Sequence, residues 1–192
     1  MIPNIIHNKE NTHRYEHLLK QMETQGIGTF KFSPAIFLDC PKTSVMEAHK
    51  KVIRDNYDQP ELIIFEDDIV FTKPDSHDRF LGLYRDIPEN VDIFLGSYYK
   101  HSKIRPVDED FDELRWAFNG LHHYIIRKKF YDTFLSLPDG KHVDRAVGDT
   151  GAKIYVPKLL LSRQMGLKEN GFSERRKTKN DYTSLEGKLK YY

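Results

Sequence analysis

Residues 61–71 constrain the fold of this chain more than any other stretch. They read Glu-Leu-Ile-Ile-Phe-Glu-Asp-Asp-Ile-Val-Phe, so three consecutive acids separate two apolar runs. An apolar run bounded by Pro60 and by Lys73-Pro74 predicts a buried strand. Because burying an unpaired carboxylate is costly, these acids need a partner. A divalent cation at the carboxyl end of a central strand is one such partner. A solvated acidic turn after an edge strand is the alternative.

Length and composition are those of one globular domain. The chain has 192 residues, 39% of them hydrophobic, which is enough for a core of its own. The net charge of +1 identifies no partner. The single cysteine, Cys40, excludes an internal disulfide. No apolar run approaches the about 20 residues of a membrane span, and the N-terminus lacks a secretory pattern. We therefore expect a cytoplasmic protein, of a bacterium or of an infected host.

Predicted strands and helices alternate along the sequence. Helices are expected from Thr12 to a cap at Gly26, from a Ser44–Glu47 capping box to about residue 56, and at 78–85, 128–137 and 143–148. Strands are expected at 2–7, 29–38, 61–66, 91–96, 121–126, 152–156 and 159–161. Residues 97–115 show no periodicity and predict a long loop. The alternation predicts an α/β fold with a mixed, mostly parallel central sheet flanked by helices.

Several motifs follow one another in an order found in one enzyme family. Glu66-Asp67-Asp68 after an aliphatic strand resembles the acidic motif of GT-A glycosyltransferases, and residues 62–68 resemble a Leu-Ile-Leu-Glu-Asp-Asp stretch. Residues 121–128 resemble an Ala-Tyr-Leu-Ile-Ser-Lys segment, and Val143-Asp144 resembles a Pro-Val/Ile-Asp motif. The remaining matches in order are Arg14, His49, Val156-Pro157, Gln164 and Ser173. Together they resemble glycosyltransferase family 25, which includes lipooligosaccharide and collagen galactosyltransferases. The likeness spans residues 2–175 and departs at Ala48, where the family has Ser, and at His122-His123.

The resemblance implies a GT-A-like nucleotide-sugar-binding fold and a metal-dependent, inverting hexosyltransferase. Residues 1–165 would form the catalytic domain, and the basic tail at 166–192 would close over the donor or acceptor site. The donor would be a nucleotide sugar, foremost a UDP-sugar carrying a hexose such as galactose or glucose. The acceptor would be a hydroxyl of a glycan, glycolipid or other molecule. A nucleic-acid acceptor has only weak support, because few aromatic residues accompany the basic ones in the tail.

The resemblance and the chemistry together name the donor-site residues. Mn²⁺ or Mg²⁺ would stabilise charge on the departing diphosphate. Asp68 is the expected direct ligand, with Glu66 and His122 as further candidates. Glu66 or Asp67 would contact the ribose or ligate through water. Two further donor-site candidates are Arg14, as a bidentate diphosphate clamp, and Gln164, by resemblance alone. The alternatives are a solvated helix position for Arg14 and an ordinary hydrogen-bonded strand position for His122.

Inverting transfer also needs a carboxylate that takes the acceptor proton. Asp144 is the first candidate and Asp149 the second; the alternative for Asp144 is a helix N-cap. Trp116 would stack on a sugar or a base, although core packing is the expected role for it. Two other functions stay open. One is an inactive nucleotide-sugar or glycan-binding domain of the same fold, and the other is a metal-dependent phosphoester hydrolase.

Overall fold

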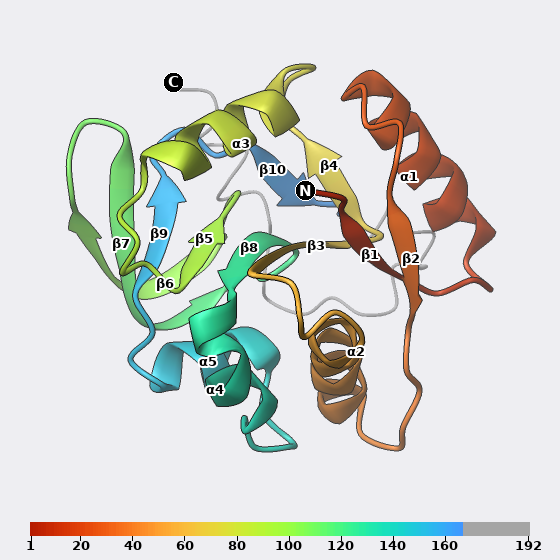
Figure 1. Ribbon diagram of the computed structural model, residues 1–192. Helices are drawn as coiled ribbons and strands as arrows, with labels where there is room; N and C mark the ends of the chain where they lie inside the picture. Colours follow the sequence, from red (N-terminus) through yellow and green to blue (C-terminus); the bar gives the residue numbers. More distant parts are fainter. Residues whose placement is uncertain (167–192) are drawn as a thin grey trace.

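A computed structural model describes residues 1–166, and a large central sheet organises it (Figure 1). The strands are β1 Asn4–His7, β2 Lys31–Pro34, β3 Glu61–Glu66, β4 Ile69–Phe71, β5 Ile93–Leu95, β6 Lys100–Pro106, β7 Phe111–Asn119, β8 His123–Arg127, β9 Ile154–Pro157 and β10 Ser162–Gln164. The helices are α1 Thr12–Thr24, α2 Pro41–Asp55, α3 Ser76–Asp86, α4 Tyr131–Leu135 and α5 Val143–Asp149, with a 3₁₀ turn at Lys128–Phe130.

The central sheet has eight strands in the order β2-β1-β3-β8-β5-β9-β7-β6. Strand β1 pairs in parallel with β2 and β3, and β5 pairs in parallel with β9. Strand β8 is antiparallel to β3 and β5, and β7 is antiparallel to β9 and β6. All strands of this central sheet except β8 and β7 therefore run in one direction. This confirms the predicted mixed, mostly parallel sheet flanked by helices.

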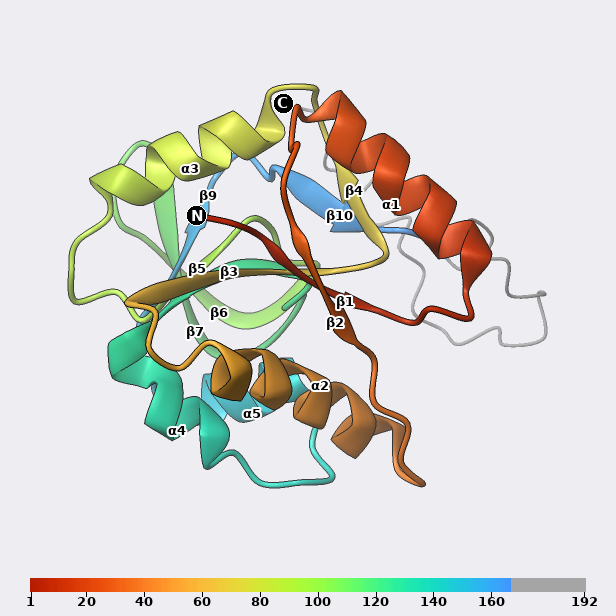
Figure 2. The same cartoon turned by 45° about the vertical axis from the view of Figure 1, so that its right-hand side comes forward.

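Helices cover both faces of the sheet, as Figures 1 and 2 show, with α1 and α3 on one side and α2, α4 and α5 on the other. Successive strand residues point to opposite faces. Ile64 and Ile126 pack in a core cluster with buried residues of α2, α4 and α5. Their neighbours Ile63 and Ile125 pack in a second cluster with buried residues of α1 and α3. Strand β3 is therefore buried on both faces, which explains why its apolar residues form a continuous run and do not alternate with polar ones.

A separate two-stranded ribbon joins distant parts of the chain beside the end of β3. Strand β4 pairs with β10 in antiparallel register, and Gln164 lies opposite Ile69. The Met165 amide donates to the Asp68 carbonyl oxygen at 2.7 Å. The ribbon thus brings residues 162–165 against the acidic turn at 66–68, almost a hundred positions earlier in the sequence.

The structure corrects two predicted helix starts. Helix α2 begins at Pro41 after an N-cap at Cys40, so Ser44 lies inside the helix and is not a cap. Proline suits the first helical turn because its φ is already helical and its missing N–H has no partner to lose there. Helix α1 is capped by Asn11, whose side chain accepts from the Arg14 amide, rather than by Thr12.

The long loop predicted at 97–115 is wrong, because this segment contains the β6 strand and the first part of β7, which form a hairpin. The basic tail proposed at 166–192 lies outside the described residues, apart from its first position. Among the helices of residues 1–166, none combines the length and the apolar character that a membrane span requires.

Candidate functional site

The three acids lie at the carboxyl end of β3, in the middle of the sheet. Glu66 is the last residue of β3, and Asp67 and Asp68 form the turn into β4. Asp67 is 3% exposed and Asp68 is 7% exposed, so this is not a solvated turn. Carboxylates that are buried this deeply need charge or hydrogen-bond partners, and the chain supplies nearly all of them.

Asp67 is held by residues from the start of the chain. Arg14 Nη1 donates to its Oδ1 at 2.6 Å, while its Oδ2 lies 2.9 Å from His7 Nδ1 and accepts from the Asn8 amide at 3.0 Å. Arg14 Nη2 lies 3.2 Å from Asp68 Oδ2, so one guanidinium bridges both aspartates. Burial acts to lower the pKa of Arg14, but the charges of Asp68 and Asp67 outweigh it and the pKa is raised. Arg14 is therefore a fixed, partly buried positive charge.

Glu66 is held from two other elements. Its Oε1 is 3.1 Å from His49 Nε2, and its Oε2 accepts from Gln164 Nε2 at 2.9 Å. The second ring nitrogen of His49 is hydrogen-bonded to the Tyr124 hydroxyl at 2.8 Å. Burial acts to raise the pKa of Glu66, but the hydrogen bond from His49 and the nearby positive charges lower it overall. Glu66 is therefore a positioned, ionised carboxylate.

Asp68 differs from the other two acids. Its Oδ1 is buried and has no hydrogen-bond partner among residues 1–166. Burial and the charge of Glu66 raise the pKa of Asp68 to about 7, although Arg14 acts in the opposite direction. A buried carboxylate oxygen without a donor is an uncompensated acceptor. It is the one oxygen of the turn that suits a cation without giving up an existing contact.

A cavity of about 520 Å³ opens beside the acidic turn, which is a size typical of small-molecule sites. One wall is polar and carries Arg14, Glu66, Asp67 and Gln164. A second part of the lining is mostly apolar and comes from the segment after β2 and the start of α2. Its apolar residues are Ala35, Ile36, Phe37, Leu38, Pro41 and Val45, with Lys42 and Ser44 among them. The cavity is therefore built to hold a ligand with one charged and one apolar portion.

Asp144 lines the same cavity from α5. Its Oδ2 accepts from Asn119 Nδ2 at 3.1 Å and from the Gly120 amide at 3.3 Å, and its Oδ1 accepts from the Arg145 amide at 2.8 Å. The helix N-cap is His142, so Asp144 is in the first turn of α5 and is not its cap. Burial raises the pKa of Asp144, although the Arg145 and Gly120 amides oppose this.

Other predicted residues lie away from the cavity. Asp149 is at the end of α5 and pairs with Lys141 at 3.4 Å in an exposed position. His122 is 1% exposed, its Nε2 is 3.0 Å from Ser97 Oγ, and burial lowers its pKa to about 4. Asp68 adjoins the cavity wall through its neighbour Asp67 but does not line the cavity itself. Within residues 1–166, no three His, Cys, Asp or Glu side chains form a group that could hold a metal ion.

The expected core position of Trp116 is wrong, because its side chain is 62% exposed. Sequence reasoning also missed the apolar wall and the two groups that orient the acids, His7 and Asn119. The apolar wall had a signal in the sequence, since Ile36-Phe37-Leu38 is an apolar run that continues past the end of β2. The sequence held no signal for His7 and Asn119, because their roles depend on contacts with residues that are distant in the sequence.

No protein-family model matches the chain, and no curated protein sequence matches it significantly. Solved structures do match. The A197 protein of STIV is 13% identical with a TM-score of 0.53, over 86% of each chain. A UDP-glucose pyrophosphorylase in complex with UDP-glucose is 10% identical with a TM-score of 0.53, over 98% of this chain and 81% of that one. A Drosophila β1,4-galactosyltransferase 7 mutant with manganese, UDP-Gal and xylobiose is 10% identical with a TM-score of 0.49, over 95% and 78%.

Likeness at such low identity shows the fold and not the activity. The chain has a GT-A-like, nucleotide-sugar-binding fold, a class that contains glycosyltransferases and nucleotidyltransferases. The narrower resemblance to glycosyltransferase family 25 stays a prediction, because no family model supports it.

Proposed function

We propose that this protein is a glycosyltransferase that moves a hexose from a nucleotide-diphosphate donor, foremost a UDP-sugar, to an acceptor hydroxyl. One observation carries the proposal: a single cavity is lined by the acidic turn of β3, by Arg14 and by Asp144 of α5. Transfer needs a donor site and a proton acceptor in the same enclosed space. The fold supports the donor class, since the UDP-glucose pyrophosphorylase structure of the same fold was obtained with UDP-glucose.

The two unlike walls of the cavity suit the two parts of a nucleotide. We place the nucleoside against the apolar wall around Ile36 and Phe37, and the diphosphate against Arg14. A guanidinium presents a planar fork of donors that matches phosphate oxygens. A ribose contact by Glu66 or Asp67 would share carboxylate oxygens that already have partners inside the chain. Gln164 would keep Glu66 in place through the hydrogen bond already described.

The residues of the turn also fit a divalent cation, in a restricted way. Mg²⁺ sites commonly use one or two carboxylates together with substrate phosphates and water. We assign Asp68 as the carboxylate ligand for Mn²⁺ or Mg²⁺, because its Oδ1 has no other partner in the described chain. Both oxygens of Glu66 are engaged by His49 and Gln164, so its role would be to position the turn. When bound, the ion would supply a Lewis acid for the departing diphosphate.

The reaction would be a single inverting displacement. The acceptor oxygen forms a bond to the anomeric carbon as the bond from that carbon to the diphosphate oxygen breaks. Asp144 takes the proton of the acceptor hydroxyl, and the nucleoside diphosphate leaves. The raised pKa of Asp144 favours its role as the base, and the hydrogen bonds from Asn119 and Gly120 fix the orientation of its carboxylate. These donors also explain how a buried carboxylate can stay ionised before it reacts.

An inactive nucleotide-sugar-binding domain is the second candidate, and one observation favours it. Every carboxylate oxygen of the turn except Asp68 Oδ1 already has a partner inside the chain. A turn satisfied in this way is stable without a metal, so binding without catalysis is chemically reasonable.

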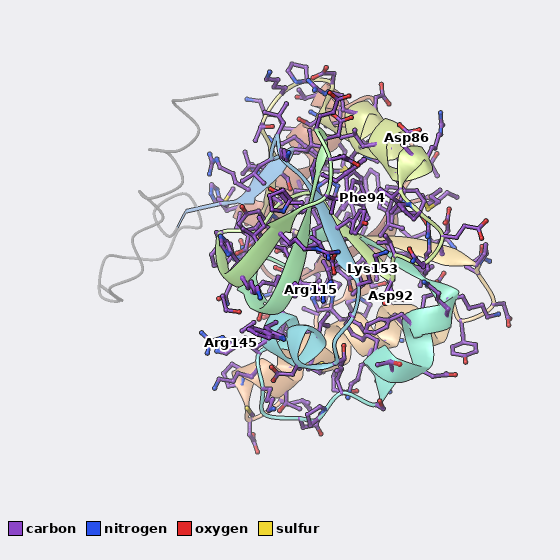
Figure 3. The ribbon with its side chains drawn as sticks, turned by 90° about the vertical axis from the view of Figure 1, so that its left-hand side faces the viewer. Asp86, Asp92, Phe94, Arg115, Arg145 and Lys153 are labelled. Carbon is purple, nitrogen blue, oxygen red and sulfur yellow. The ribbon has the colours of Figure 1, made fainter. Side chains whose placement is uncertain are left out.

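Calorimetric titration with UDP, with and without Mn²⁺, tests the donor site. We expect UDP to bind, Mn²⁺ to tighten binding, and Asp68→Asn to remove the Mn²⁺ effect while keeping the fold. Asp86→Asn is the matched control, because Asp86 is an exposed aspartate at the end of α3 (Figure 3) and does not line the cavity. No binding of UDP in either condition contradicts the proposed donor site. UDP binding that Mn²⁺ does not affect would support the donor site but contradict the proposed metal site.

A further inference from the structure

Trp116 is exposed to an unusual degree for the largest apolar side chain. It is the only tryptophan in the sequence, and 62% of it is accessible to solvent. Single exposed apolar side chains are common, and Phe37 is more exposed still, so exposure alone does not mark a site. A flat aromatic ring held in a fixed position, however, offers a surface on which a ligand can stack. Neither the donor cavity nor the proposed chemistry uses this residue, so its exposure needs its own explanation.

The backbone at Trp116 is held in a rare conformation. The β6–β7 register pairs His101 with Phe118 but Lys103 with Arg115, so β7 carries one extra residue in this interval. Trp116 has a φ of 65°, and it is the only non-glycine residue with positive φ in the part of the chain that the structure describes. Bulges re-aim side chains, and such strain persists only where the surroundings enforce it.

The surroundings that enforce this conformation are backbone contacts. A Cβ atom added to Gly148 of α5 would lie 2.2 Å from the Trp116 carbonyl oxygen, so strand and helix backbones touch directly here. The Ser102 hydroxyl donates to the Ala117 carbonyl at 3.0 Å on the other side. Lys103 Nζ lies 5.2 Å from the centre of the indole ring, a cation–π contact that favours this orientation. The ring is thus preorganised and still mostly accessible.

The backbone at Trp116 also packs against the helix that carries the proposed base. Gly148 follows Asp144 by one turn of α5, which is about 5–6 Å along the helix. Asn119, three residues after Trp116 on β7, holds the Asp144 carboxylate. Strand β7 and helix α5 pack together, and Figure 3 shows Arg115 and Arg145 on these two elements at the same side of the molecule. An acceptor that reaches Asp144 with its reacting sugar would therefore place a neighbouring sugar near Trp116.

We propose that Trp116 is a stacking platform for a saccharide of the acceptor, one sugar unit from the hydroxyl that reacts. This rests on the proposed function and narrows the acceptor to an oligosaccharide or a glycan of at least two sugars. A flat indole suits the apolar face of a pyranose. Single-stranded nucleic acid fits less well. It needs several aromatic residues along a basic groove, whereas Trp116 is the only exposed aromatic residue of the β6–β7 hairpin, and Arg115 is already paired with Glu113 at 2.7 Å.

Glycan-array binding with the whole chain tests the proposal, with Trp116→Ala and Trp116→Gly as variants. The glycine variant is the fold control, since glycine adopts φ of 65° without strain, and we expect it to melt no lower than the alanine variant. Tyr57→Ala is the matched surface control, because Tyr57 is an exposed aromatic residue outside this region. We expect the wild type and Tyr57→Ala to bind the same glycans, and both Trp116 variants to bind them at least about tenfold more weakly. Because Trp116 is the sole tryptophan, titration of the wild type with a bound glycan should also change its fluorescence.

Glycan binding that survives in both Trp116 variants overturns the proposal, as does a wild type that binds no glycan. Binding of single-stranded oligonucleotides in place of glycans also overturns it. Donor hydrolysis measured on the same variants separates the two sites: its loss in both Trp116 variants would assign Trp116 to the donor site and overturn the acceptor proposal. If the wild type hydrolyses no donor but binds glycans through Trp116, the transferase proposal fails and the saccharide platform stands.

Discussion

Lowering the pH should destabilise the protein through His122, which is 1% exposed. Burial lowers its pKa from 6.5 to about 4, with the charge of Glu66 opposing. Below the unfolded-state pKa, the unfolded chain takes up a proton here that the folded chain does not accept. The free energy of unfolding therefore falls by about 1.4 kcal/mol per pH unit as the pH drops from 6.5 toward 4. Between about pH 6.5 and pH 4.5, His122 alone accounts for a loss of about 2 kcal/mol.

The assay is urea unfolding of the wild type and of His122→Gln at about pH 7.5 and pH 4.5. Glutamine offers an amide to Ser97 but does not titrate. Burial also lowers the pKa values of His77 and His123. His77 titrates in both proteins, whereas the charge of His122 contributes to the lowered pKa of His123, so the difference between the two proteins reports His122 together with its effect on His123. We expect the wild type to lose at least about 2 kcal/mol more than the variant over this range. Equal losses would refute the reasoning, because they would mean that His122 accepts a proton in the folded state, as an accessible side chain does.

Three further substitutions test the site. Asp144→Asn should lower the transfer rate by about 10²–10⁴-fold, because it removes the base, with UDP affinity by calorimetry unchanged; a near-normal rate would exclude Asp144. Arg14→Lys should weaken UDP binding about tenfold, since a point charge replaces the planar fork, and unchanged affinity would place the diphosphate elsewhere. Gly148→Ala should lower the free energy of unfolding by about 1–3 kcal/mol, because its Cβ meets the Trp116 backbone. Its control is Gly82→Ala in α3, which has open space and should be neutral or stabilising. Equal stabilities of these two variants would contradict the close packing of the Gly148 and Trp116 backbones.

Local patterns predicted the centre of the fold well. The apolar run of β3 is buried on both faces and lies between β1 and β8, which is where its composition placed it. The need of the three acids for partners also followed from burial alone. Most of these partners proved to be protein groups, among them His7, His49 and Gln164, and these come from three separate elements. No local pattern contains such contacts, because the register of distant strands creates them.

The β6–β7 hairpin shows why other parts could not be predicted. Strand β6 lies at the edge of the sheet and is mostly polar, and in β7 the buried Glu113 follows Phe111 on the same face and interrupts the apolar alternation expected of a strand. Trp116 was expected in the core because its size and apolarity favour burial. The bulge that turns it outward depends on packing between β7 and α5, which sequence periodicity does not report.

The most direct test of the central claim is release of nucleoside diphosphate from a panel of nucleotide sugars, measured with Mn²⁺ or Mg²⁺ for the wild type and for Asp68→Asn. The proposed function predicts that at least one donor, foremost a UDP-sugar, is hydrolysed by the wild type and that Asp68→Asn loses most of this activity while remaining folded. A wild type that hydrolyses no donor in the panel, or an Asp68→Asn variant as active as the wild type, would contradict it.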